Sequence, residues 1–263
     1  MELTDTEPNS PPSAEMLGLD VRNARLAWDE AVLLDDFSFS APAGSWTCLL
    51  GESGVGKSTL LRTIAGLIEP VSPTEIRAHD GTALHARVAY MAQQDLLLPW
   101  LSAIENVALG ARLRGERADR ERALNILARA GVADRANALP SELSGGERQR
   151  VALARTLMEE RPIVLMDEPF SALDAITRTR LQDLAVDLLD NRTVLMVTHD
   201  PFEALRLADT IFILSDGAQP GRAAIVPPGA TPRDPTDPAL RESHQTIMQR
   251  LSNGAARASG DMA

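Results

Sequence analysis

The chain has 263 residues, of which 44% are hydrophobic and 24% charged, which allows a packed core in one large domain or two small ones. Its formal net charge of −11 argues against nucleic acid or anionic lipid as the main partner. No stretch approaches the ~20 apolar residues that span a bilayer. The acidic N-terminus is unlike a secretory signal, so we expect a cytoplasmic protein.

Elements expected in chain order begin with a disordered tail at residues 1–16, which are rich in Pro, Ser, Glu and Asp. From about Leu19 onward, short apolar runs alternate with helical patterns. The expected strands are Trp46–Leu50, Val88–Met91, Ile163–Met166, Val194–Val197 and Ile211–Leu214. The helices expected to follow strands are Lys57–Ala65, Ala175–Leu189 and Pro201–Leu207. This alternation predicts an α/β fold with a largely parallel sheet.

A helical region interrupts the alternation. The segments Ile104–Leu113, Arg120–Ala130 and Glu147–Glu159 show helical patterns with no strand between them. We therefore expect a helical subdomain at about 95–160, inside a domain that spans 17–219. Residues 220–263 are expected to form a Pro- and Gly-rich tail with one short amphipathic helix, Ala239–Leu251.

A glycine-rich segment, Gly51–Ser58, matches the pattern G-x-x-x-x-G-K-[ST] and follows an apolar strand. Its glycines let backbone N–H groups turn inward around a phosphate, and the next helix offers its positive N-terminus. Lys57, the only lysine among 26 basic residues, would reach the β- and γ-phosphates, and Ser58 would offer a hydroxyl to Mg²⁺. The predicted ATP-binding residues are Gly51, Ser53, Gly54, Gly56, Lys57, Ser58 and Thr59.

Two carboxylates, Asp167 and Glu168, end the apolar run that starts at Ile163. In phosphate-loop ATPases an Asp at such a strand end holds Mg²⁺, usually through water. A neighbouring Glu can accept a proton from the attacking water. Many strands end in acids, so these roles for Asp167 and Glu168 depend on the phosphate loop being present.

The segment Leu143–Arg150, Leu-Ser-Gly-Gly-Glu-Arg-Gln-Arg, resembles the signature of the ABC transporter ATPases almost letter for letter. Ser144, Gly145 and Gly146 present a hydroxyl and backbone donors at a helix start, a second place for an anion. The resemblance covers about residues 19–217. It implies a phosphate-loop NTPase core with a mainly parallel sheet, an antiparallel β portion and a helical subdomain.

The resemblance also implies roles for residues outside these motifs. Trp28 matches the aromatic residue that stacks on adenine, with a buried core tryptophan as the alternative. Gln93 resembles the glutamine that senses Mg²⁺ and the γ-phosphate, although Gln94 leaves a one-residue ambiguity. His199 resembles the histidine that contacts the γ-phosphate, and Ser171–Asp174 the loop that crosses a dimer interface. A head-to-tail homodimer is implied, with ATP between one subunit's Lys57 and the other's Ser144.

The partners implied are membrane permease subunits docking near Leu97–Trp100 and, indirectly, a solute-binding protein, which places the chain on the inner face of the membrane. Leu-Leu-Pro-Trp at 97–100 is similar to the nitrate, sulfonate and taurine importer branch. The longer string Met91–Trp100 looks most like members assigned to thiamine-precursor pyrimidine uptake. Two alternatives stay open. Leu97–Trp100 could pack inside the helical subdomain, or the protein could be a soluble ABC ATPase that remodels a protein complex.

Overall fold

The computed structural model describes residues 16–28, 31–214 and 224–260. The expectation of a disordered tail therefore concerns, apart from Met16, residues outside the described part. Within the described ranges, no helix is long and apolar enough to cross a membrane.

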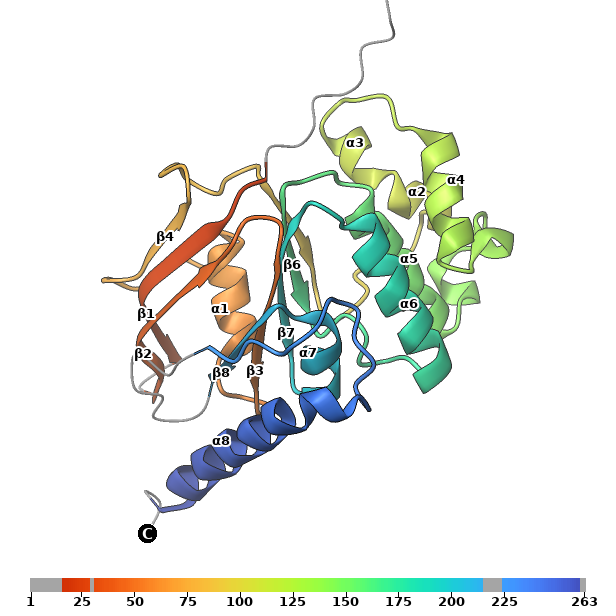
Figure 1. The fold of residues 1–263 in the computed structure, drawn as a ribbon. Helices are drawn as coiled ribbons and strands as arrows, with labels where there is room; N and C mark the ends of the chain where they lie inside the picture. Colours follow the sequence, from red (N-terminus) through yellow and green to blue (C-terminus); the bar gives the residue numbers. More distant parts are fainter. Residues whose placement is uncertain (1–15, 29–30, 215–223, 261–263) are drawn as a thin grey trace, which may run out of the picture.

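A parallel sheet of five strands, in the order β5-β6-β7-β3-β8, forms the centre of the molecule (Figure 1). Its strands are β3 (Trp46–Gly51), β5 (Val88–Met91), β6 (Ile163–Asp167), β7 (Thr193–Thr198) and β8 (Thr210–Leu214). Strands β3, β6 and β7 are buried along their whole length, which explains why they read as continuous apolar runs. All five strands predicted from the sequence are confirmed.

Two apolar clusters cover the two faces of this sheet. Because successive side chains of a strand point to opposite faces, Leu49 of β3 belongs to one cluster while Cys48 and Leu50 belong to the other. The Leu49 cluster includes helix α1 (Lys57–Ile64) and the antiparallel strands. The Cys48 cluster includes residues of α5 (Gly145–Leu157), α6 (Ala175–Leu188) and α7 (Pro201–Leu207).

The second sheet is antiparallel, with three strands in the order β2-β1-β4. It consists of β1 (Leu19–Trp28), β2 (Ala31–Ala41) and β4 (Glu75–Ala78), and it packs over α1. The antiparallel portion implied by the family resemblance is thus confirmed. Its individual strands were not located from the sequence. The pairing of β1 with β2 shifts register three times between Val21 and Ala27, which obscures the twofold alternation of a regular strand.

The helical region lies to one side of the parallel sheet and joins β5 to β6 (Figure 1). It contains α2 (Ala103–Val107), α3 (Leu109–Leu113), α4 (Arg120–Arg129), two 3₁₀ turns at Ala133–Arg135 and Pro140–Glu142, and α5. The prediction of a single helix at Ile104–Leu113 is wrong in one respect. This stretch forms two short helices, α2 and α3, separated at Ala108, where φ −82° and ψ 1° depart from helical geometry. Periodicity cannot resolve a break of one residue, because the apolar spacing continues across it.

The segment after residue 223 packs against the body of the protein. Ile225 exchanges two backbone hydrogen bonds with Ile211 of β8, 2.8 and 2.9 Å long. The buried guanidinium of Arg233 donates to five backbone carbonyls, those of Leu205, Ala208, Pro227, Pro228 and Gly229. After the 3₁₀ turn Pro238–Leu240, helix α8 (Arg241–Gly260) contributes Ile247 to the core and is longer than the amphipathic stretch read from the sequence. Hydrogen bonds to carbonyls distant in the sequence attach this segment to the rest of the protein, an attachment that its Pro- and Gly-rich composition did not indicate.

Candidate active site

The glycine loop between β3 and α1 has backbone conformations that require glycine. Gly54 and Gly56 have φ values of 88° and 97°, in the left-handed region that favours glycine, and Gly56 is the N-cap of α1. Gly51 is needed for a different reason, since a Cβ there would lie 2.3 Å from the carbonyl oxygen of Leu214 in β8. The loop therefore starts in close contact with β8 and leads into the N-terminus of α1, and the first N–H groups of a helix have no intrahelical acceptor and can bind an anion.

Lys57 points back into this loop. Its side chain is buried, and Nζ donates to the carbonyl oxygens of Gly51 at 2.7 Å and Glu52 at 2.6 Å. Burial lowers the pKa of the ammonium group, while the carboxylates of Glu168 and Asp167 oppose that shift. A charged ammonium at the start of α1, in a loop whose backbone amides can also donate, is suited to hold a polyphosphate.

Asp167, at the end of β6, lies against the start of α1. Its carboxylate is fully buried and accepts a hydrogen bond of 2.7 Å from the Ser58 hydroxyl and one of 3.4 Å from the Tyr90 hydroxyl. Burial raises the pKa of Asp167, and the bond from Ser58 opposes the shift. No sequence signal indicated Tyr90; it reaches Asp167 because β5 lies beside β6, with Tyr90 paired to Leu165.

Metal binding at this point would depend on few protein atoms. Among the described residues no group of three or more His, Cys, Asp or Glu could hold an ion by itself. Magnesium typically takes only one or two protein carboxylates and completes its shell with phosphate oxygens and water. The adjacent Ser58 hydroxyl and Asp167 carboxylate are hard oxygen donors of that kind, so they fit Mg²⁺ bound together with a phosphate.

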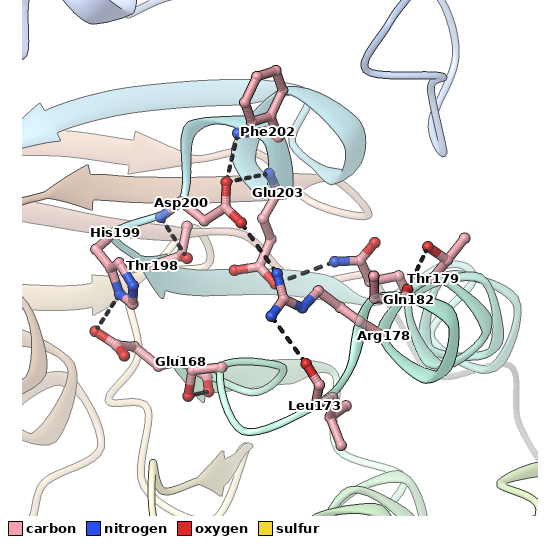
Figure 2. A network of polar contacts seen from close by, with 12 residues as sticks. Glu168, Leu173, Arg178, Thr179, Gln182, Thr198, His199, Asp200, Phe202 and Glu203 are labelled. Atoms are coloured by element: carbon pink, nitrogen blue, oxygen red, sulfur yellow. Dashed lines mark hydrogen bonds and ion pairs between the residues drawn. The ribbon is translucent and has the colours of Figure 1, made fainter. Parts of the chain in front are cut away.

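Glu168 receives a partner on each carboxylate oxygen. Gln93 Nε2 donates to Oε2 at 3.2 Å. On the other side, His199 Nδ1 lies 3.2 Å from Oε1 (Figure 2). The Glu168 backbone has φ 46°, and its N–H donates to the Val197 carbonyl of β7 at 3.0 Å. The structure thus brings Glu168, Gln93 and His199 together, and of the two adjacent glutamines it is Gln93 whose amide meets this carboxylate.

The signature residues form a separate group within the chain. Ser144 is the N-cap of α5 and exchanges hydrogen bonds with Glu147, which hold the pKa of that carboxyl below its usual value. In the portion of the chain that is described, no hydrogen bond or ion pair joins Ser144, Gly145 or Gly146 to the phosphate loop. Trp28 ends β1, and its side chain lies outside the described residues.

A glycine loop closed by a lysine, followed in space by a buried aspartate and a glutamate at the end of a parallel strand, defines a phosphate-loop ATPase. The particular family follows from comparison with known proteins. The family model for ABC transporters matches residues 34–171, and the chain belongs to this family as an ATP-binding domain.

Two similar proteins extend over nearly the whole chain. An ABC transporter ATP-binding protein of Haemophilus influenzae, described as uncharacterized, is 43% identical over 88% of this chain and 97% of its own length. The aliphatic sulfonates import ATP-binding protein SsuB 1 of Rhodococcus jostii is 42% identical over 91% of this chain and 96% of its own. Among solved structures, the ATP-binding cassette MJ0796, a dimer in a post-hydrolysis state with ADP and Pi, is 31% identical. The two structures superpose with a TM-score of 0.70, and the match covers 81% of this chain and 100% of that one.

Proposed function

We propose that the protein binds and hydrolyses ATP as the energising subunit of an ABC importer for a small solute of the nitrate, sulfonate, taurine or thiamine-precursor pyrimidine type. For hydrolysis, the supporting observation is the Glu168 carboxylate, one residue from the Asp167–Ser58 pair and contacted on both oxygens. For import, the support is likeness to proteins named for aliphatic sulfonate import at 42% identity, which makes an aliphatic sulfonate our first choice of solute.

In this proposal the loop amides and Lys57 bind the phosphates of ATP. Ser58 and Asp167 would hold Mg²⁺, which would neutralise phosphate charge. Glu168 accepts a proton from water as the water oxygen bonds to the γ-phosphorus and the bond from that phosphorus to the bridging oxygen breaks. Gln93 and His199 orient the Glu168 carboxylate through its two oxygens, and His199 contacts the γ-phosphate.

The site becomes complete in a head-to-tail homodimer. The N-terminus of α5, with Ser144, Gly145 and Gly146, offers donors for an anion but has no link to its own phosphate loop among the described contacts. A second copy would bring these donors to the ATP that Lys57 holds. Residues Ser171–Asp174 would lie at the same interface.

The docking surface proposed for the permease is narrower than the sequence suggested. Leu97 is buried in the apolar core, so the alternative of internal packing applies to it. Trp100, however, is 71% exposed and Leu96 is 58% exposed. Arg155 holds the backbone here, donating to the carbonyls of Asp95 and Leu96 at 2.7 and 2.9 Å. An exposed tryptophan close in sequence to Gln93 is a suitable contact for a hydrophobic partner.

We expect Trp100→Ala to weaken association with the permease by about 10- to 30-fold, because truncating a central aromatic contact costs about 2 kcal/mol. ATP affinity should stay within about 2-fold, since Trp100 makes none of the contacts of the phosphate loop. Co-purification of the permease with the tagged subunit, and nucleotide titration of the same samples, measure the two effects. Val226→Ala, which truncates a side chain 70% exposed elsewhere, is the matched control. Unchanged assembly and transport in Trp100→Ala would count against the docking role.

Transport itself tests the proposed function. Cells lacking this gene should lose uptake of an aliphatic sulfonate, and the wild-type gene should restore it while the Glu168→Gln gene should not. Nitrate, taurine and a hydroxymethylpyrimidine are measured in parallel. Loss of one of these instead would reassign the solute, and unchanged uptake of all four would reject the importer role.

A further inference from the structure

An arginine in α6 connects the segments that follow Glu168 and His199. Arg178 lies in the first turn of α6, and its guanidinium turns back toward the preceding loop. Nη2 donates to the Leu173 carbonyl at 3.0 Å, and Nη1 donates to Asp200 Oδ2 at 3.4 Å (Figure 2). Leu173 belongs to the loop after Glu168, while Asp200 directly follows His199. One planar group therefore joins two separate parts of the site.

Asp200 uses its two carboxylate oxygens for different purposes. Oδ1 accepts from the backbone N–H groups of Phe202 at 2.9 Å and Glu203 at 3.4 Å, which caps α7. Oδ2 is left for Arg178. The Asp200 backbone N–H also donates to the Thr198 hydroxyl at 3.1 Å. The backbone on both sides of His199 is thereby fixed.

These contacts close into a circuit that returns to Glu168. The Glu168 carbonyl accepts from the Ser171 backbone N–H at 3.3 Å and from its hydroxyl at 3.0 Å, which ties the loop to the base. The loop connects through Arg178 to Asp200 and so to His199, whose Nδ1 lies 3.2 Å from Glu168 Oε1. The His199 side chain is 53% exposed. An imidazole that is half in solvent is only partly restrained by packing, so polar contacts on either side help to set its position.

A second hydrogen bond joins α6 to α7. Gln182, one turn after Arg178, donates from Nε2 to Glu203 Oε1 at 3.2 Å, and both side chains are buried. This buried hydrogen bond joins the two helices a second time, one turn from the Arg178–Asp200 contact.

We propose that Arg178 is a positioning residue for ATP hydrolysis, which keeps His199 against Glu168 by joining the Leu173 carbonyl to Asp200. The inference rests on the proposed role of Glu168 as the base. Arginine suits the task because its fork donates in two directions from one plane, whereas a lysine ammonium would be a single point on a flexible stem. The pair is partly exposed, so its role is geometric more than stabilising.

Asp200→Asn tests this with little disturbance of the fold. Asparagine has a single carbonyl oxygen, which can still cap α7, but its amide group would then face the Arg178 donor. We expect kcat to fall about 5- to 10-fold, with KM for ATP within about 2-fold and an unchanged melting temperature. In Arg178→Ala, kcat should fall at least as far, and the conservative change Arg178→Lys should not restore it. The control is Asp183→Asn, which removes the ion pair between Asp183 of α6 and Arg206 of α7 and should keep the wild-type kcat.

A double-mutant cycle separates positioning from general structural damage. If Asp200 and Arg178 act through His199, Asp200→Asn in a His199→Ala background should lower single-turnover hydrolysis by less than about 2-fold. The same 5- to 10-fold loss in both backgrounds, or no loss in the wild-type background, would overturn the proposal. Glu168→Gln is measured beside them. Wild-type turnover in that variant would overturn the base assignment itself, whereas an inactive Glu168→Gln with a fully active Asp200→Asn would overturn only the positioning role.

Discussion

The Glu168→Gln variant should bind ATP with nearly wild-type affinity and hydrolyse it about 10²- to 10⁴-fold more slowly, the range expected for loss of a general base. The amide has almost the shape of the carboxylate, so the contact with Gln93 can persist, but it cannot take a proton from water. With hydrolysis blocked, the ATP-bound state should accumulate, and the protein should elute from gel filtration in MgATP as a dimer.

Glu160→Gln provides a matched control for this variant. Glu160 also has a left-handed backbone, with φ 48° against 46° at Glu168, and it pairs with Arg122 at the surface. Its substitution should leave phosphate release unchanged, so that loss of turnover in Glu168→Gln cannot be attributed to backbone strain. A Glu168→Gln protein that stayed monomeric in MgATP, or that released phosphate at the wild-type rate, would contradict the assignment of the base.

Replacing Lys57 with methionine should weaken ATP binding by about 10- to 100-fold or more, because hydrogen bonds from a charged donor contribute about 1.5–3 kcal/mol. Arginine should not restore binding. Lys57 is 5% exposed and its Nζ is held 2.6–2.7 Å from two loop carbonyls, a geometry that the larger planar guanidinium cannot reproduce. Titration with a fluorescent ATP analogue measures the loss.

Two measurements guard this interpretation. Lys57→Met leaves the Gly51 and Glu52 carbonyls without their donor, so a thermal melt must show that the variant still folds. Arg62→Met removes a cation five residues further along α1 and should change ATP affinity by less than about 3-fold. Equal losses in the two variants would indicate a general charge effect, and wild-type affinity in Lys57→Met would refute the role of the lysine.

Local patterns determined the parallel sheet and the phosphate loop. Strands β3, β6 and β7 are buried on both faces, so each is a continuous apolar run that is recognisable without its neighbours. The loop from Gly51 to Ser58 is contiguous, and its glycine conformations and its lysine follow from eight adjacent residues. The same holds for the cap of α5, where Ser144 and Glu147 are three residues apart.

Irregular strands and long-range contacts could not be predicted from the sequence. The register shifts of β1 hid the antiparallel strands, and the C-terminal segment is attached by Arg233 to carbonyls up to 28 residues away. Exposure was also undetermined in Leu97–Trp100, where one end is buried and the other faces solvent. Spacing alone could not decide this, because burial depends on which elements pack above a residue.

The candidate site illustrates the difference most directly. Its residues were identified from their motifs, but the contacts between them join positions that are distant in the sequence. Ser58 and Asp167, for example, are 109 residues apart. Tyr90 at Asp167 and Arg178 at Asp200 carried no motif, and only the order of the strands and the packing of α6 against α7 placed them there. The sequence by itself determined which groups the chemistry uses. The tertiary structure decided which groups hold them in place, because hydrogen bonds require distances near 3 Å that a chain sets only when its sheet is assembled.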